Sequence, residues 1–348
     1  MEKKFKVGGL FSGVGGIELG FKKNGFSIVW ANEYDKHCQK TYLKNFEHKF
    51  IFDDIHKING ASLEPVDVLC GGFPCQAFSV AGYRKGLKDS RGNLFFEIVR
   101  LINELETKPK VLFLENVKNF YTHDGGRTFR ILKQELEHLG YCVFTKVLNT
   151  SLYTSIPQTR ERTFIICFLE GEHAFMYDSC PMSRTFKNNF PPKEIRKSLP
   201  MTEVLEKHVP EKYYYRSDKY MYKSLIENMK RKETFYQWRR VYVRENKSNL
   251  CPTLTANMGT GGHNVPLVLT NNGIRKLTPR ECFTLQGFPK DFHLPEDIAD
   301  SHLYKQAGNS VTVTLIESLA KIVLKSLNSE NLLISKQSND VSVFSPVH

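Results

Sequence analysis

The alternation of short apolar runs with helical patterns restricts the fold of this chain more than any other feature of its sequence. Apolar runs occupy residues 5–11, 27–32, 66–70, 111–114, 141–148 and 163–169. Helical periodicity occurs between them, at residues 17–21, 36–45, 94–105 and 127–139. Short apolar runs bounded by turn residues are typical of buried strands, and strands that alternate with helices form parallel sheets. We therefore predict an α/β domain whose chemistry lies at the carboxyl ends of its strands.

A glycine-rich turn follows the first predicted strand. It reads Phe11-Ser12-Gly13-Val14-Gly15-Gly16 and leads straight into a helical pattern. A strand, a glycine turn and a helix N-terminus together favour a nucleotide-type ligand, although an ordinary tight turn between a strand and a helix is the alternative. The turn lacks both the GxGxxG dinucleotide fingerprint and the Lys-Ser or Lys-Thr pair of a P-loop, so those two ligand classes are disfavoured.

Acidic residues end the second predicted strand and a third, short strand that is predicted just before Asp53. Glu33 lies roughly 20 residues after the glycine turn, where such folds bind a ribose hydroxyl. Tyr34 or Phe11 would flank an adenine ring. Asp53 or Asp54 would either reach an adenine amino group or cap a short helix.

Groups suited to catalysis follow the later strands. Cys75 comes after a stiff turn formed by Pro74, and its thiol would act either as a nucleophile or as a small buried apolar group. Glu115 directly follows an all-apolar strand, where desolvation raises the pKa of a carboxyl group and suits a general acid, with a structural hydrogen-bonding role as the alternative. Arg160 and Arg162 are two residues apart and would share one face of a strand.

Composition indicates an intracellular protein with a polyanionic partner. The formal net charge of +12 favours nucleic acid, with a merely basic protein as the alternative. No apolar run reaches the ~18 residues that a membrane helix needs, and the N-terminus has no signal-peptide pattern. The eight cysteines show no paired CxxC spacing, which disfavours a zinc site and fits a reducing compartment. We expect a cytoplasmic protein without a metal or a membrane partner.

Two later regions carry basic residues. Residues 77–93 are rich in Gly, Ser, Arg and Lys and predict a long loop that suits phosphates. From residue 176 to residue 268 the strand–helix alternation stops, and arginines are interleaved with aromatic residues. This pattern suits phosphate contacts and the readout of guanine, with a solvated basic face as the alternative.

The C-terminal part predicts two helices. Thr278-Pro279-Arg280-Glu281 has the sequence of a capping box with proline at the first helical position. An amphipathic helix is predicted over residues 311–327, opened by residues 304–310, and a polar tail follows from residue 328.

Taken in order, five motifs resemble those of the DNA (cytosine-5) methyltransferases. They are Phe11-Ser12-Gly13-Val14-Gly15-Gly16, Pro74-Cys75-Gln76, Glu115-Asn116-Val117, Gln158-Thr159-Arg160-Glu161-Arg162 and Gly308-Asn309-Ser310-Val311. The resemblance extends over residues 6–327. One departure is Thr154-Ser155 before Ile156-Pro157-Gln158, where the family usually has glycine.

The resemblance implies a Rossmann-like sheet with helices on both faces, plus a smaller mixed target-recognition domain. The implied divisions are a catalytic and cofactor-binding domain at 1–175, target recognition at 176–272, a connector at 273–303, a C-terminal helix at 304–330 that completes the cofactor site, and a polar tail at 331–348. The implied catalytic residues are Cys75, Glu115, Arg160 and Arg162. Those implied for S-adenosylmethionine are Phe11, Ser12, Gly13, Gly15, Gly16, Glu33, Tyr34, Asp54, Ile55, Pro74, Leu94, Asn309 and Ser310. Those implied for DNA are Gln76, Ser79, Arg84, Lys85, Arg91, Arg239, Arg240, Arg244, Thr253, Gly261 and Gly262.

The activity implied is methyl transfer to C5 of a cytosine rotated out of duplex DNA, through a covalent bond between Cys75 and C6. The expected partners are double-stranded DNA and a cognate restriction endonuclease that forms no stable complex with this chain, which is expected to be a monomer. Three other readings stay open at this point: a tRNA cytosine-5 methyltransferase, an inactive DNA-binding paralogue and, disfavoured by its missing fingerprint, a dehydrogenase.

Overall fold

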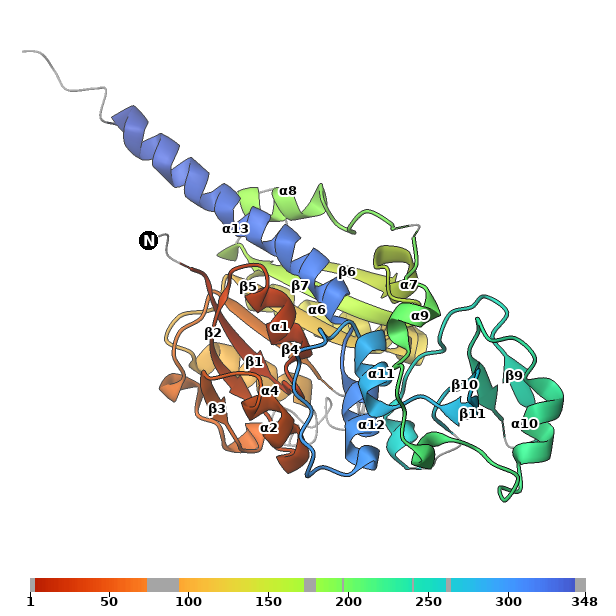
Figure 1. Cartoon of the computed structure of the whole chain (residues 1–348). Coiled ribbons are helices and arrows are strands. Elements are labelled where there is room, and N and C mark those ends of the chain that lie inside the picture. The colour runs from red at the N-terminus through yellow and green to blue at the C-terminus, as the bar shows by residue number, and fades with distance from the viewer. Residues whose placement is uncertain are drawn as a thin grey trace, which may run out of the picture.

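The computed structural model describes residues 4–73, 94–171, 180–195, 197–239, 241–260 and 264–341, with side chains as far as residue 329 (Figure 1). The strands are β1 (Lys6–Leu10), β2 (Ser27–Asn32), β3 (Lys49–Ile51), β4 (Val68–Gly72), β5 (Val111–Val117), β6 (Tyr141–Asn149), β7 (Glu161–Leu169), β8 (Tyr236–Trp238), β9 (Val243–Glu245), β10 (Leu267–Thr270) and β11 (Gly273–Lys276). The helices are α1 (Gly16–Lys22), α2 (Lys36–Leu43), α4 (Leu94–Glu104), α5 (Asn119–Thr122), α6 (Arg127–His138), α7 (Thr150–Tyr153), α8 (Pro181–Lys187), α9 (Met201–Val204), α10 (Tyr222–Asn228), α11 (Pro279–Leu285), α12 (Asp300–Asn309) and α13 (Val313–Val341).

The large sheet has the strand order β3-β2-β1-β4-β5-β7-β6. Its first five strands pair in parallel, whereas β7 runs antiparallel to both β5 and β6. Residues 150–160, which join β6 to β7, hold only the short helix α7, and such a connection is too short for a parallel crossover. The strand order reverses between β1 and β4, which is the point where open α/β sheets bind their ligands.

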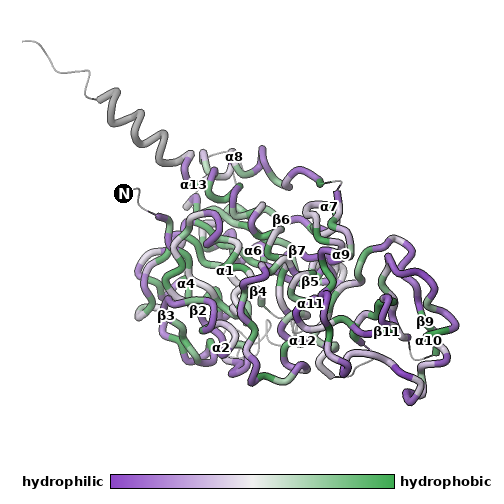
Figure 2. The backbone as a smooth tube through the Cα atoms, in the orientation of Figure 1, coloured by the Kyte–Doolittle hydropathy of each residue, from purple (hydrophilic) through white to green (hydrophobic). Residues whose placement is uncertain are grey.

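Helices cover both faces of this sheet, as predicted. On one face, Phe21 of α1 and Ile316 of α13 belong to the same buried cluster as the strand residue Phe113. On the other face, Phe95 of α4 and Leu132 of α6 pack with Leu112 and other strand residues. Figure 2 shows hydrophobic residues along the central strands and on the helix faces that cover them. Burial on both faces explains the all-apolar composition of β5 before Glu115.

A small antiparallel sheet, with the order β11-β10-β8-β9, forms the second part of the molecule. The structure moves both boundaries predicted for this part. Helix α8 lies beyond the predicted boundary at residue 176, yet its buried Met182 and Phe186 pack into the core of the large sheet. Strand β11 lies in the predicted connector, yet it pairs with β10 in the small sheet. In each case tertiary packing and strand pairing, rather than local composition, decide to which sheet the segment belongs.

The C-terminal region differs from the single helix predicted from residue 304 onward. Residues 304–309 belong to α12. This helix ends at Ser310, whose backbone is extended with φ −69° and ψ 169°. A residue outside both helices stabilises the turn between α12 and α13, because the Val313 N–H donates to the Gln286 carbonyl at 2.8 Å. Helix α13 then continues past residue 327 to Val341, so part of the predicted polar tail is helical.

Candidate active site

A cavity of about 410 Å³ lies at the switch point of the large sheet and is called here the switch-point cavity. Its lining comes from the ends of β1, β4 and β5 and from the junction of α12 and α13. Among the predicted cofactor residues, those that line it are Phe11, Ser12, Gly13, Gly16, Glu33, Tyr34, Leu94, Asn309 and Ser310. Segments far apart in the sequence therefore meet at one site, as the motif order predicted.

Backbone hydrogen bonds hold the glycine turn and the end of β2 together. The Glu33 carboxylate accepts the Gly13 N–H at 2.9 Å and the N–H groups of Tyr34 and Asp35 at 2.8 and 2.9 Å. Gly13 has φ +54°, a left-handed conformation that glycine adopts without strain. Glu33 is thus fixed against the turn, while Tyr34, 69% exposed, offers an aromatic face beside it.

The α12–α13 junction closes the cavity against α1. A Cβ atom added at Gly16 would lie 2.7 Å from Ser310 Oγ and 3.0 Å from Val311 Cγ2. No real side chain fits at such distances, so glycine at this position allows the two segments to touch. Asn309 and Ser310 therefore line the cavity next to the glycine turn.

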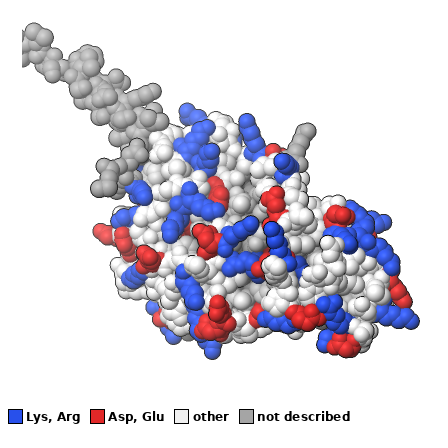
Figure 3. Space-filling model, in the orientation of Figure 1, with Lys and Arg blue, Asp and Glu red and all other residues white. Residues whose placement is uncertain are grey.

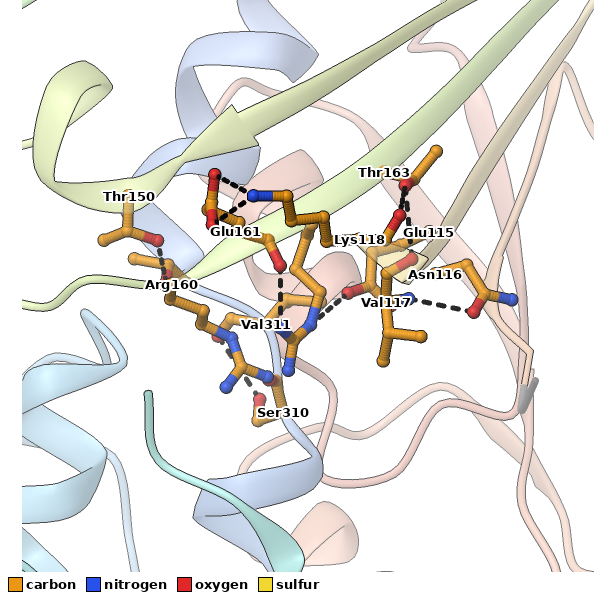
Figure 4. A network of polar contacts seen from close by, with 12 residues as sticks. Glu115, Asn116, Val117, Lys118, Thr150, Arg160, Glu161, Thr163, Ser310 and Val311 are labelled. Carbon is orange, nitrogen blue, oxygen red and sulfur yellow. Dashed lines mark hydrogen bonds and ion pairs between the residues drawn. The ribbon is translucent and has the colours of Figure 1, made fainter. Parts of the chain in front are cut away.

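A carboxylate–guanidinium pair lies at the end of β5. Arg162 Nε is 3.0 Å from Glu115 Oε1, and both side chains line the cavity. Burial raises the pKa of Glu115, and the adjacent Arg162 guanidinium opposes that shift. Figure 4 shows Glu115 and its neighbour Asn116 at the end of this strand. The Asn116 amide donates to the Phe73 carbonyl at 2.9 Å and so fixes the last described residue before Pro74 and Cys75.

Arg160 differs from the prediction, which placed it in the chemistry beside Arg162. Its side chain is buried, is not among the described residues that line the cavity, and donates to backbone carbonyls, including that of Ser310 (Figure 4). The two arginines flank Glu161 and start from one end of β7, but only Arg162 meets Glu115. The spacing of the arginines could not predict this difference, because it depends on the segments that fold against each side chain.

Three predicted cofactor residues are also absent from the described lining of the switch-point cavity. Asp54 accepts the His56 N–H at 3.0 Å, which is the helix-cap role stated as its alternative, and Ile55 is buried in the core beside it. Gly15 has φ +85°, and a Cβ atom there would lie 2.3 Å from the Phe46 ring, so this glycine serves packing. A cofactor role for these three stays a prediction.

Several predicted residues lie outside the described part of the chain. They are Pro74, Cys75, Gln76, Ser79, Arg84, Lys85, Arg91, Arg240, Gly261 and Gly262, together with the whole of the predicted loop at 77–93. The Thr154-Ser155 departure is described: neither residue has a positive φ, and Thr154 is extended, with its hydroxyl donating to the Thr150 carbonyl at 2.9 Å. This turn therefore does not require glycine.

Two polar groups at the site were missed by the sequence analysis. The first is Glu18, which is buried directly beneath the glycine turn and whose Oε2 has no hydrogen-bond partner. The hydroxyl of Ser12, a predicted residue, is likewise buried without a partner. Lys305 forms an ion pair with Asp35 at 3.1 Å at the rim of the cavity. An acid at a helix position that faces the core is the one sequence signal that could have indicated Glu18.

A second hollow, the polar cleft, has a volume of about 600 Å³ and is lined by residues in and beside β8 and β9 of the small sheet, by the segment around Thr253 and by Thr159, just before β7. Three predicted DNA residues line it: Arg239, Arg244 and Thr253. The sequence analysis missed Gln237, whose side-chain oxygen accepts a hydrogen bond from Arg239 Nη2 at 3.0 Å. Figure 3 shows Lys and Arg side chains over the visible face, including the edge of the small sheet, interspersed with acidic residues.

Metal and membrane sites have no support among the described residues. That part of the chain holds no group of three or more His, Cys, Asp or Glu side chains placed to bind a metal ion. None of the helices searched in it has both the length and the apolar character that crossing a bilayer requires.

The switch-point cavity fits a nucleoside-type cofactor. Its volume lies within the range of ligand pockets, Tyr34 offers a face for an aromatic ring, and the unpartnered Ser12 hydroxyl supplies a free polar atom. This site, the strand order and the one antiparallel strand of the large sheet, β7, are together typical of the Rossmann-like methyltransferases.

Comparison with known proteins gives the family. The model of the C-5 cytosine-specific DNA methylases matches residues 5–325. The chain is 52% identical over 327 residues to the Type II methyltransferase M.Bsp6I of Bacillus sp. (strain RFL6), covering 92% of this chain and 99% of that protein. It is 42% identical to M.NgoBI of Neisseria gonorrhoeae, covering 91% and 92%. The solved structure of the Entamoeba histolytica methyltransferase EhMeth shares the fold, with a TM-score of 0.70 at 18% identity, over 94% of this chain and 99% of that one.

This chain therefore belongs to the C-5 cytosine-specific DNA methylase family. It is a DNA (cytosine-5) methyltransferase whose methyl donor is S-adenosylmethionine. The predicted family, fold and cofactor are confirmed, and DNA rather than tRNA is the substrate that these matches support.

Proposed function

We propose that this chain is the modification enzyme of a Type II restriction–modification system and methylates one cytosine in a short specific site of duplex DNA. Support comes from the Type II methyltransferases to which it is similar over almost its whole length. The proposal includes a monomeric protein in the cytoplasm and a cognate restriction endonuclease that acts on the same site without forming a stable complex. The polar cleft, lined by Arg239 and Arg244, would receive the DNA, because arginine suits both phosphates and guanine.

The observation that carries the residue roles is the Glu115–Arg162 pair in the same cavity as the glycine turn. Cytosine C5 is a poor nucleophile, so electrons must first enter the ring. In the proposed reaction the Cys75 thiolate forms a bond to C6, while Glu115 hydrogen-bonds N3 and the exocyclic amine and Arg162 stabilises charge near O2. Burial raises the pKa of Glu115 and so favours the protonated form of the carboxyl, which can donate to N3.

S-adenosylmethionine supplies an electrophilic methyl group when it is bound. In our proposal, Glu33 and the glycine turn would hold its ribose and amino-acid portions, and Asn309 and Ser310 would complete the site beside the turn. The methyl group would pass to C5 as its bond to the sulfonium sulfur breaks, with S-adenosylhomocysteine as the leaving group. C5 then loses its proton to a base, and the bond between Cys75 and C6 breaks to release the thiolate. A base stacked in a duplex cannot reach this site, so the cytosine must rotate out of the helix.

Bisulfite sequencing of DNA treated with purified protein tests this proposal. The wild-type protein should leave one protected cytosine in a fixed short context. Cys75→Ser should lower methyl transfer by at least ~10³-fold while still binding S-adenosylmethionine, because the hydroxyl is a far weaker nucleophile. Cys180→Ser is the matched control, since Cys180 is a half-buried helix cap on α8 and serine is a good cap. Unchanged methyl transfer by Cys75→Ser would refute the covalent mechanism.

A further inference from the structure

Arg160 holds together three separate segments of the chain. Its guanidinium is buried, with the residue only 1% exposed. Nη1 donates to the Leu254 carbonyl at 2.8 Å, and Nη2 donates to the carbonyls of Gly308, at 3.2 Å, and Ser310. A buried cation ordinarily has an acidic partner, whereas every hydrogen-bond partner described for this guanidinium is a main-chain carbonyl. A planar guanidinium with fixed donor directions places its acceptors relative to one another.

The segments that Arg160 joins belong to the two binding regions. Gly308 and Ser310 line the switch-point cavity. Leu254 lies between Thr253 and Thr255, and both threonines line the polar cleft. One side chain therefore spans from a wall of the cofactor cavity to a wall of the cleft that we propose receives DNA.

The segments that Arg160 joins are also held by other close contacts. The Leu254 N–H donates to Gln158 Oε1 at 3.1 Å, so both polar backbone groups of Leu254 are held by side chains that precede β7. On the other side, a Cβ atom at Gly308 would lie 2.1 Å from the carbonyl carbon of Thr255, which shows that the two backbones are in direct contact. A shift of residues 308–310 must therefore displace residues 254–255.

We propose that Arg160 is a positioning residue that couples occupancy of the switch-point cavity to the DNA affinity of the polar cleft. A ligand that fixes Asn309 and Ser310 fixes the carbonyls that Arg160 binds, and through them the Leu254 segment of the cleft. The first ligand to bind then supplies the free energy needed to order these segments, so the second ligand binds more tightly. By thermodynamic reciprocity, each ligand raises the affinity for the other by the same factor. This inference rests on the proposed function, since it takes the polar cleft as the DNA site.

The test measures a coupling ratio. The dissociation constant of a fluorescent duplex carrying the methylated site is determined by anisotropy, with and without saturating S-adenosylhomocysteine, which cannot react. In the wild-type protein we expect the nucleoside to tighten DNA binding at least ~5-fold, within the range usual for coupled sites. In Arg160→Lys the ratio should fall below about 2-fold, because an ammonium group cannot hold both carbonyl sets in one plane.

Arg275→Lys is the matched control. Arg275 is also 1% exposed and pairs with Glu281 at 2.6 Å, but it is not among the described residues that line either hollow. It should lose stability and keep the wild-type coupling ratio. A wild-type ratio near 1, or an unchanged ratio in Arg160→Lys, would overturn the proposal. If the wild-type protein fails to methylate DNA at all, the proposed function fails instead.

Hydrogen exchange of the wild-type protein keeps the test decisive if Arg160→Lys does not fold. Saturating S-adenosylhomocysteine should slow amide exchange in residues 253–257 at least ~3-fold without any DNA present, since ordering one wall restricts local opening of the other. Unchanged exchange in that segment would contradict the coupling.

Discussion

Glu18 shows how strongly one buried side chain responds to its surroundings. It lies in α1 beneath the glycine turn, and burial raises its pKa to about 7. The groups that face it are Ser12, whose nearby hydroxyl opposes the shift, and Glu33, Tyr42 and Cys70, which interact with it electrostatically. The acid form of Glu18 is therefore the one that the folded protein favours over most of the range below neutral pH.

Replacing Glu18 with Gln should change how stability depends on pH. A carboxyl whose pKa is higher in the folded state contributes stability that is present below its ordinary pKa of 4.5 and is lost as pH rises through about 7. Between pH 4.5 and pH 8, the free energy of unfolding of Glu18→Gln should therefore rise relative to wild type by up to roughly 3 kcal/mol. Urea unfolding at both pH values measures this, and a constant difference between the two proteins would contradict it.

Glu115 should be needed for the chemical step and not for binding the cofactor. Glu115→Gln keeps the shape of the side chain but cannot exchange a proton with N3 of the base. We expect single-turnover methyl transfer to fall by ~10²-fold or more, with the affinity for S-adenosylmethionine changed less than about threefold. Rapid-quench assays with labelled methyl donor measure the rate, and a rate within threefold of wild type would remove Glu115 from the proposed mechanism.

At the scale of elements, the packing of α1 against the C-terminal helices decides the shape of the cofactor cavity. Two glycines of α1 make this packing possible. Gly16 faces the α12–α13 junction at the cavity, and Gly20 faces Ile316 of α13, where an added Cβ would lie 2.6 Å from Cγ2. Only Gly16 lines the cavity.

Gly16→Ala and Gly20→Ala should therefore separate stability from cofactor binding. Both variants overpack the same helix contact and should lose ~1–3 kcal/mol in the free energy of unfolding. Only Gly16→Ala should also weaken the affinity for S-adenosylmethionine, by at least ~10-fold, because it pushes Ser310 and Val311 out of the cavity wall. Calorimetric titration of both proteins gives the comparison, and equal affinities would show that the junction does not shape the site.

At the scale of the whole molecule, the net charge of +12 determines how DNA binding responds to salt. The polar cleft contributes Arg239 and Arg244 to this charge. By contrast, Arg216 is not among the described residues that line the cleft, and it is paired with Glu211 at 2.6 Å. An arginine already neutralised by a carboxylate releases few counterions when DNA binds.

Salt titrations should distinguish these arginines. Replacing Arg244 with Gln should reduce the slope of log K against log[salt] by about 1, as the loss of one phosphate contact does. Arg216→Gln serves as the control and should leave the slope at the wild-type value. A slope that falls equally in both variants would show that the effect comes from total charge and not from the polar cleft.

The sequence by itself determined the elements and the family. Periodicity located the strands of the large sheet and most of its helices, because each element must bury one face. The Thr278 capping box is present as predicted, since it depends only on neighbouring residues. The motif order identified the glycine turn, Glu115 and Arg162, and the end of the second predicted strand identified Glu33. The structure brings all of them to one cavity.

Only the tertiary structure decided where individual side chains point and to which sheet a segment belongs. Arg160 and Arg162 look alike in the sequence, yet one holds backbone carbonyls and the other meets Glu115. Helix α8 packs on the large sheet, Asp54 caps a turn, and Glu18 is buried. The physical reason is the same in each case: burial and hydrogen-bond partners come from residues far away in the chain, and local pattern contains no information about them.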